Sequence, residues 1–478
     1  MEKLDIIAAP LEEKSLKLLL FGAGELGKEI AIEAQRLGME IVAVDRYERA
    51  PAQQVAHRAY TVNMMDANAM RSIVDRERPD IIIPEIEAID LDILFEFEED
   101  GYLVTPNARA TYAAMNRERI RELIVASGVK TGAYAYTRTD DPLEFRDAVE
   151  KIGYPCFSKA IMSSSGKGSY FIRGREDIEA AINAARYETR GSGEMAIIEE
   201  YVPFDTEVTE LAVRHLDEDG SGIVTTFPKP IGHYQIDGDY HSSWQSPNVA
   251  EYLPYHVDEI GESAGKDNDN DRNRNHDHDH DPDPALAKEA EKKIYEAARK
   301  ITNELGGVGV FGCELFVRVK DGSVEVYANE CAPRPHDTGM VTYISHPQGF
   351  NEGGLHVRAA AGLPIPPTGT RGGYRVFDPI APAASHVIIS HAAGFDPEYR
   401  GVFDAMAVSG VNIHLFGKPL AYHSGWIVEE RMGIALAMGD NAFDAKRKAE
   451  VAAHKIMIRT AAEREWRGQE EKRMHVVE

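Results

Sequence analysis

The chain has 478 residues, of which 43% are hydrophobic and 28% are charged, and its formal net charge is −26. This length suggests about three domains, and the hydrophobic content excludes a wholly disordered chain. The excess of acidic residues argues against nucleic-acid binding through a basic surface. No apolar run reaches the roughly 20 residues that a membrane-spanning helix needs, so we expect no membrane association.

The amino terminus and the cysteines bear on where the protein works. The first residues, Met1–Asp5, lack the basic patch and apolar core of a secretory signal. The three cysteines, Cys156, Cys313 and Cys331, are an odd number at wide spacing, which predicts neither a disulfide framework nor a CxxC metal site. We therefore expect a cytoplasmic protein.

From Leu18 to about Pro106, apolar runs alternate with amphipathic segments. This rhythm predicts a parallel, doubly wound sheet. Its predicted elements are a strand Leu18–Phe21, a helix to Leu37, a strand Glu40–Val44, a helix from Asp66 to Arg76 and a strand Asp80–Pro84.

A glycine-rich turn, Gly22-x-Gly24-x-x-Gly27, joins the first strand to the first helix, and Asp45 follows the second strand. This is the context of a dinucleotide fingerprint, in which an acidic residue holds a ribose. The alternative is a Rossmann-like domain that binds another phosphorylated ligand. Glu25 favours this alternative, because a carboxylate inside the turn would repel a pyrophosphate but could hold a hydroxyl or an amine. Glu85 and Glu87 follow the strand Asp80–Pro84 at its carboxyl end, where such sheets bind ligands, although two solvated loop acids are the alternative.

A Gly/Ser-rich segment, Ser163 to Ser169, lies between two predicted strands, Pro155–Lys159 and Tyr170–Arg173. It is not a P-loop, because Gly168 follows the lysine where Ser or Thr is required. It would close a hairpin, and such a loop can fold its amides over nucleotide phosphates. Lys159 would add a cation at its base; an ordinary mobile hairpin tip is the alternative.

The remaining chain contains further strands, one acidic insertion and one long helix. We expect long strands over Glu199–Leu211 and Gly222–Pro228 and a helix over Pro284–Leu305. The Asp/His/Asn-rich tract near 263–284 has no apolar periodicity, so we expect a disordered insertion there and not a metal site. After Pro364 a strand-rich module begins, and it closes with a helix near the carboxyl terminus.

Two glutamates in a predicted hairpin point to a cation. Asp321-Gly322 predicts a turn between strands Val308–Val319 and Val324–Asn329. Glu314 and Glu330 are equidistant from Gly322, so we expect them to lie opposite each other on one face. Facing like charges are destabilising unless a cation lies between them, and carboxylates with phosphate oxygens suit Mg²⁺. The neighbouring Cys313 and Cys331 would point to the opposite face.

Together these features resemble the ATP-grasp superfamily and, within it, the formate-dependent phosphoribosylglycinamide formyltransferase family. The resemblance implies an α/β fold with a Rossmann-like amino-terminal domain (1–115), an ATP-grasp domain (116–365) and a small strand-rich carboxyl-terminal domain (366–478). The motifs that carry it are Gly24–Glu29, Val44–Tyr47, Pro84–Ile89, Met115–Arg117, Ser163–Gly168, Glu314 with Asn329-Glu330, Pro333–Val341 and Leu415–Pro419.

The resemblance also implies roles for individual residues. It implies a homodimer that uses ATP and Mg²⁺ to formylate glycinamide ribonucleotide with formate, through formyl phosphate, in purine synthesis. Glu314 and Glu330 would hold Mg²⁺, and Lys159 and Asp337 would be catalytic. ATP would contact Arg117, Lys159, Ser164, Ser165, Gly166, Lys167, Gly168, Ser169, Glu199, Glu200, Tyr201, Val202 and Glu207. Glycinamide ribonucleotide would contact Glu25, Leu26, Glu85, Asp337, Lys418 and Arg431.

The chain departs from the family pattern at three positions. Glu430 precedes Arg431 where the family has a second arginine, Ala160 stands where Pro is usual, and Ser169 stands where Gln is common. The sequence leaves three alternatives open: another ATP-grasp carboxylate activator such as a bicarbonate-using purine enzyme, a nicotinamide oxidoreductase, and an inactive nucleotide-binding module.

Overall fold

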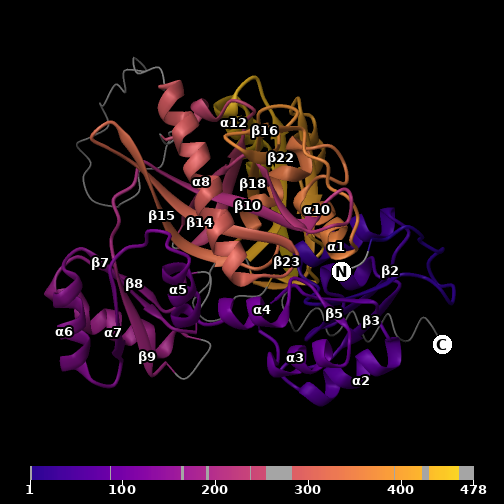
Figure 1. Cartoon of the computed structure of the whole chain (residues 1–478), viewed down its shortest axis with the longest axis horizontal. Helices are drawn as coiled ribbons and strands as arrows, with labels where there is room; N and C mark the ends of the chain where they lie inside the picture. Colours follow the sequence, from indigo (N-terminus) through magenta and orange to yellow (C-terminus); the bar gives the residue numbers. More distant parts are fainter. Residues whose placement is uncertain are drawn as a thin grey trace.

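A computed structural model describes residues 3–86, 88–162, 166–189, 193–236, 238–254, 283–391, 393–421 and 430–461. Figure 1 shows a large central sheet with two smaller lobes beside it, one built from the amino-terminal segment. The predicted α/β architecture is confirmed. Ser164, Ser165, Glu87 and nearly all of the 263–284 insertion lie outside the described residues.

The amino-terminal lobe is a five-stranded parallel sheet in the order β3-β2-β1-β4-β5. Strands β1 and β2 are almost wholly buried, as their continuous apolar runs predict. Strand β3 was not predicted, because its Arg-Ala-Tyr-Thr sequence is short and half exposed. The elements are β1 (Lys17–Phe21), α1 (Glu25–Arg36), β2 (Glu40–Asp45), a short helix (Pro51–Gln54), β3 (Arg58–Thr61), α2 (Ala67–Glu77), β4 (Ile81–Pro84), α3 (Asp92–Glu99) and β5 (Leu103–Val104).

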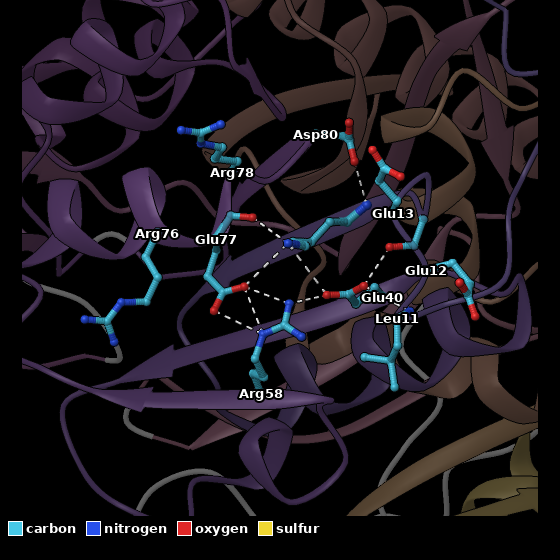
Figure 2. Close-up of a pocket in the computed structure, with 11 residues that line it drawn as sticks. Leu11, Glu12, Glu13, Glu40, Arg58, Arg76, Glu77, Arg78 and Asp80 are labelled. Carbon is cyan, nitrogen blue, oxygen red and sulfur yellow. Dashed lines mark hydrogen bonds and ion pairs between the residues drawn. The ribbon is translucent and has the colours of Figure 1, made fainter.

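An ion cluster lines a cavity of about 560 Å³ at the amino ends of these strands, away from the ligand edge (Figure 2). Arg58 pairs with the carboxylates of Glu40 and Glu77, both about 95% or more buried. Ser15 donates a 2.6 Å hydrogen bond to Glu40, and Lys17 lies 3.7 Å from the same carboxylate. The cluster therefore ties the segment before β1 to three strands of the sheet.

A four-stranded antiparallel sheet, in the order β6-β9-β7-β8, forms the second small lobe. Its β7–β8 pair confirms the predicted hairpin. The predicted continuous strand Glu199–Leu211 is wrong: β9 ends at Glu200 and β10 begins at Thr206, and Pro203 between them has no N–H to give to a ladder. The elements are α4 (Ala108–Ala114), α5 (Arg117–Ala126), β6 (Tyr134–Arg138), α6 (Pro142–Ile152), β7 (Cys156–Ala160), β8 (Ser169–Ile172), α7 (Ile178–Tyr187) and β9 (Met195–Glu200).

The central sheet has eleven strands among the described residues and packs against α8 (Pro284–Leu305). Helix α8 has the predicted bounds; Asp283 caps its start by accepting a hydrogen bond from the Ala285 N–H, and Gly306 follows its end at φ +73°. The strands before and after it are β10 (Thr206–Leu216), β11 (Ile223–Pro228), β12 (Ile231–Ile236), β13 (Asp239–Gln245), β14 (Gly309–Lys320), β15 (Ser323–Ala332), β16 (Gly369–Arg371) and β17 (Tyr374–Phe377).

The β14–β15 hairpin places Glu314 opposite Glu330, as predicted, but for a different reason. Its two-residue turn pairs Lys320 with Ser323, and that regular register would oppose Glu314 with Asn329. A bulge at Asn329 shifts the register by one residue, so that Glu330 lies opposite Glu314 and Cys331 opposite Cys313.

The carboxyl-terminal segment extends the same central sheet through β18, β22 and β20. Helix α12 packs on β18 and β22 and confirms the predicted late helix. Because one sheet crosses residue 365, the division at that position stays a prediction. The elements are α9 (Thr342–Ser345), α10 (Glu352–Ala360), β18 (Ala383–Ser390), β19 (Gly394–Arg400), α11 (Val402–Met406), β20 (Val411–Leu415), β21 (Leu420–Ala421), β22 (Glu430–Met438), α12 (Ala442–His454) and β23 (Met457–Ala461). Within the described ranges, no helix has the length and apolarity to cross a bilayer.

Candidate active site

The glycine-rich turn lies against Glu85 and Asp45. Gly22 has φ +105°, and a Cβ there would lie 2.7 Å from Glu85 Oε2, so only glycine fits. The Ala23 N–H donates a 2.8 Å hydrogen bond to Asp45 Oδ2, and the Arg46 N–H donates to Oδ1 at 2.7 Å. Asp45 therefore closes the turn instead of presenting a carboxylate to a ribose, which argues against the nicotinamide alternative.

Four of the six predicted substrate residues form one ion network. Lys418 Nζ lies 3.4 Å from Glu25 Oε2, and the Arg431 guanidinium lies 3.5 Å from Glu25 Oε1 and 2.5 Å from Asp337 Oδ2. Burial alone would raise the pKa of Asp337, but Arg431, with His336 and Arg334, outweighs burial and lowers this pKa to about 2. Segments some 400 residues apart in the sequence thus meet in one ion network.

The remaining two predicted substrate residues, Leu26 and Glu85, differ in how they can contact a ligand. Leu26 is 2% exposed and packs in a core with Met340, Phe416 and Ile434, so its side chain is structural and only its backbone can meet a ligand. Glu85 follows β4, and its N–H donates to the Phe21 carbonyl at 2.8 Å. It therefore lies at the carboxyl edge of the sheet, where such folds bind ligands.

Glu430, the residue that departs from the family pattern, is an internal counter-ion. Its Oε1 accepts a 2.5 Å hydrogen bond from Lys418 Nζ. Burial would lower the pKa of Lys418, but the carboxylates of Glu25 and Glu430 raise it. Both predicted substrate cations, Lys418 and Arg431, are therefore paired with carboxylates of the chain itself.

A second cluster joins the predicted ATP residues. Lys159 Nζ lies 2.6 Å from Glu199 Oε2, and Arg121 pairs with the other oxygen of that carboxylate. Burial would raise the pKa of Glu199, but Lys159 and Arg121 lower it to about 2. Arg121 was not among the predicted site residues, because its place on an amphipathic helix does not indicate that its guanidinium group is buried.

The end of β9, the connection after it and the start of β10 hold four further predicted ATP residues. The Glu200 side chain accepts a 2.8 Å hydrogen bond from the Ala133 N–H, so it positions backbone. Tyr201 packs its ring 5.7 Å from that of Phe171, and Val202 is 8% exposed. Glu207, on the neighbouring β10, lies 3.7 Å from the buried His233.

The predicted phosphate loop is described only in its second half. Gly166 and Gly168 have φ values of +68° and +64°, which favour glycine. A Cβ at Gly168 would lie 2.9 Å from that of Ala160. Lys167 lies in this turn and Ser169 is the first residue of β8. Both are on the same hairpin as Lys159.

Nitrogen-bearing side chains from neighbouring segments contact the predicted metal pair. Glu314 accepts hydrogen bonds from Gln235 at 3.1 Å and Asn329 at 3.2 Å, and His336 Nε2 lies 3.2 Å from it. Despite burial, His336 keeps the pKa of Glu314 at about 2, so the group is ionised. Glu330 faces it across the hairpin and lies 3.1 Å from Arg117. Two carboxylates and an amide oxygen are a donor set that suits Mg²⁺.

Three domain families match the sequence. The ribonucleotide synthetase preATP-grasp domain matches residues 16–114, the ATP-grasp domain matches 122–269 and 268–348, and the PurT C-terminal domain matches 383–456. These matches follow the order that the sequence motifs predicted.

Solved structures share the fold at low identity. An N5-carboxyaminoimidazole ribonucleotide synthetase from Thermotoga maritima superposes with a TM-score of 0.68 at 22% identity, over 93% of this chain and 99% of that one. A glycinamide-RNase-transformylase T from Mycobacterium tuberculosis gives a TM-score of 0.65 at 23% identity, over 92% and 99%. At these identities the likeness shows the fold alone.

Sequence relatives are much closer. The chain is 52% identical to a formate-dependent phosphoribosylglycinamide formyltransferase from Pyrococcus horikoshii over 475 residues, 99% of each chain. It is 50% identical to the protein of that name from Thermococcus kodakarensis over 475 residues, again 99% of each. The Geobacter metallireducens protein of that name is 42% identical over 456 residues, 95% of this chain and all of that one. The chain therefore belongs to the formate-dependent phosphoribosylglycinamide formyltransferase family, an ATP-grasp family of enzymes.

Proposed function

We propose that the protein uses ATP and Mg²⁺ to formylate the amine of glycinamide ribonucleotide with formate. One observation carries the proposal: the hairpin register sets Glu314 opposite Glu330, beside Arg117 and Lys159. Two carboxylates and two cations at one site match the needs of a metal–nucleotide complex. The substrates in this proposal are inferred from the name of the family to which the chain belongs.

The first step would make formate electrophilic. A carboxylate lacks a leaving group, so one formate oxygen attacks the γ-phosphorus of ATP, the bond to the β-phosphate oxygen breaks, and ADP leaves. Arg117 and Lys159 would balance charge on the phosphates during this transfer. Mg²⁺, held by Glu314 and Glu330 when bound, would supply further neutralisation of the phosphate oxygens.

The second step would transfer the formyl group. The substrate amine attacks the formyl carbon, the carbon–oxygen bond to phosphate breaks, phosphate leaves, and the nitrogen loses a proton. Asp337 would orient the amine once the substrate replaces it as the partner of Arg431. The glycine-rich loop with Lys167 would keep water from the mixed anhydride.

The proposal is tested by ADP release with formate and glycinamide ribonucleotide, added singly and together. Fast release with both, and a formylated product, is the expected result. Release that needs bicarbonate instead of formate would favour a different carboxylate activator. No ATP turnover under any combination would contradict the proposal.

Replacing Glu330 by Gln should abolish ATP turnover, because the amide halves the charge of the metal pair while it keeps the shape of the side chain. Glu325→Gln is the matched control on the same strand, since Glu325 pairs with Lys130 at the surface. Turnover and thermal unfolding are measured for both variants. Near-normal turnover of Glu330→Gln would contradict the metal role.

We also propose a homodimer located in the cytoplasm, with domains at 1–115, 116–365 and 366–478. Family membership supports the first two of these proposals. Light scattering gives the oligomeric mass, cell fractionation gives the location, and limited proteolysis locates the domain boundaries.

A further inference from the structure

Two neighbouring rows of side chains cross the central sheet in register. The first row contains the predicted metal pair. Thr209, Glu314 and Glu330 are paired across β10, β14 and β15 and share one face. The next row, Glu210, Cys313 and Cys331, points to the opposite face, as alternation along a strand requires. The cysteine row therefore lies directly behind the glutamates, under α8.

The two cysteines are placed for a covalent bond. Their sulfur atoms lie 3.0 Å apart, and the residues are 0% and 1% exposed. Directly opposed residues of antiparallel strands have Cα atoms about 4.5 to 5.5 Å apart, which falls inside the range that disulfides span. The sulfurs need to approach by only about 1 Å to reach the disulfide length of about 2.05 Å.

We propose that Cys313 and Cys331 are a redox-modification site, at which a peroxide links β14 to β15 through a disulfide. Both S–H bonds break, an S–S bond forms, and the O–O bond of the peroxide is reduced to two molecules of water or alcohol and water. A dithiol reductant restores the free pair. Glu210, buried with no hydrogen-bond partner among the described residues, offers a small polar oxidant a contact beside the thiols.

The disulfide would disturb the site in front of it. Glu314 and Glu330 are each the next residue along the backbone from a cysteine, so drawing the sulfurs together shifts both carboxylates. Mg²⁺ tolerates little departure from octahedral geometry. Oxidation should therefore lower ATP turnover by about tenfold, the scale of outer-shell changes at metal sites. This consequence rests on the proposed function, whereas the disulfide itself does not.

Cys156 provides an internal control. It is buried on β7, in the core of the four-stranded lobe with Phe145 and Ile172, and neither other cysteine belongs to that core. Among the described residues, Cys156 has no second thiol in that core with which to form a disulfide. A peroxide should therefore distinguish the hairpin pair from this lone thiol.

The experiment treats the full-length protein with hydrogen peroxide, alkylates remaining thiols after denaturation, and maps peptides by mass spectrometry. We expect a Cys313–Cys331 link, an alkylated Cys156, and turnover that falls on oxidation and returns with dithiothreitol. Cys331→Ala and Cys313→Val should make turnover insensitive to peroxide, whereas Cys156→Ala should behave as wild type. Mapping of the wild-type protein does not depend on whether a variant folds.

Two outcomes overturn the inference. Peptides that carry only sulfinic acids, or alkylated thiols at both positions, would show that the pair does not close. A disulfide that leaves turnover unchanged would remove its role as a switch. Absence of formylation in the reduced protein, with the disulfide present after oxidation, would instead contradict the proposed function alone.

Discussion

At the scale of single residues, the predicted substrate residues and Glu430 form a network with more acidic than basic side chains. Lys418 and Arg431 face Glu25, Glu430 and Asp337, so two cations meet three acids. A phosphate that binds here must displace a carboxylate from each cation. The arginine that the family pattern has at position 430 would add a positive charge to this site. Glu430 adds a negative charge instead, so it weakens the attraction of the site for an anionic substrate.

Replacing Glu430 by Gln should therefore lower the KM for glycinamide ribonucleotide about fivefold, because a partly exposed ion pair contributes about 1 kcal/mol. The KM for ATP should not change, since Glu430 lies with the substrate residues. Steady-state kinetics of Glu430→Gln check this, with Glu398→Gln, an exposed acid on β19, as control. A raised KM would show that Glu430 contacts the substrate itself.

At the scale of elements, helix ends and strand registers aim the catalytic groups. Asn116 caps α5 by accepting hydrogen bonds from the Glu118 and Arg119 N–H groups. The cap fixes the start of the helix, and Arg117, the first helical residue, reaches Glu330 from there. A local capping motif thus positions a charge against a distant hairpin.

The change Asn116→Ala should lower the free energy of unfolding by about 1 kcal/mol, because the helix loses its cap. It should also raise the KM for ATP, because the first turn of α5 no longer holds Arg117 in place. Asp141→Ala is the matched control: Asp141 caps α6 in the same way, away from the site. Urea unfolding should show similar losses for both variants. If both raise the KM equally, the cap has no special role at the site.

At the scale of the whole molecule, the ion cluster of Figure 2 makes stability depend on pH. Burial would raise the pKa of Glu40, but hydrogen bonds from Ser15 and Arg58 lower it to about 2. A carboxyl with a lowered folded-state pKa stabilises the fold above its unfolded pKa of about 4.3, and this stabilisation is lost as pH falls toward 2.

We expect the unfolding free energy to fall between about pH 5 and pH 2, with about 2 kcal/mol of that loss due to Glu40 after allowance for the partly exposed Arg58. Glu40→Gln should flatten this part of the curve, while Glu99→Gln, at an exposed helix end, should not. Urea titrations at a series of pH values measure it. An unchanged slope in Glu40→Gln would contradict the assignment.

The order of the elements, the glycine-rich turn and the β7–β8 hairpin could be read from the sequence alone. These are local or periodic signals: apolar runs, turn residues and alternation along a strand. The break at Pro203 between β9 and β10 was missed, and so was β3, because a short, half-exposed edge strand has no clear apolar pattern.

Which side chains meet could be learned only from the tertiary structure. The bulge at Asn329 sets the register that opposes Glu314 to Glu330 and Cys313 to Cys331, and no turn rule specifies it. The pairing of Arg121 with Glu199 and of Lys418 with Glu430 joins segments that carry no shared pattern. Such contacts depend on burial and packing between elements that are distant in the sequence. They are therefore defined only in the folded chain.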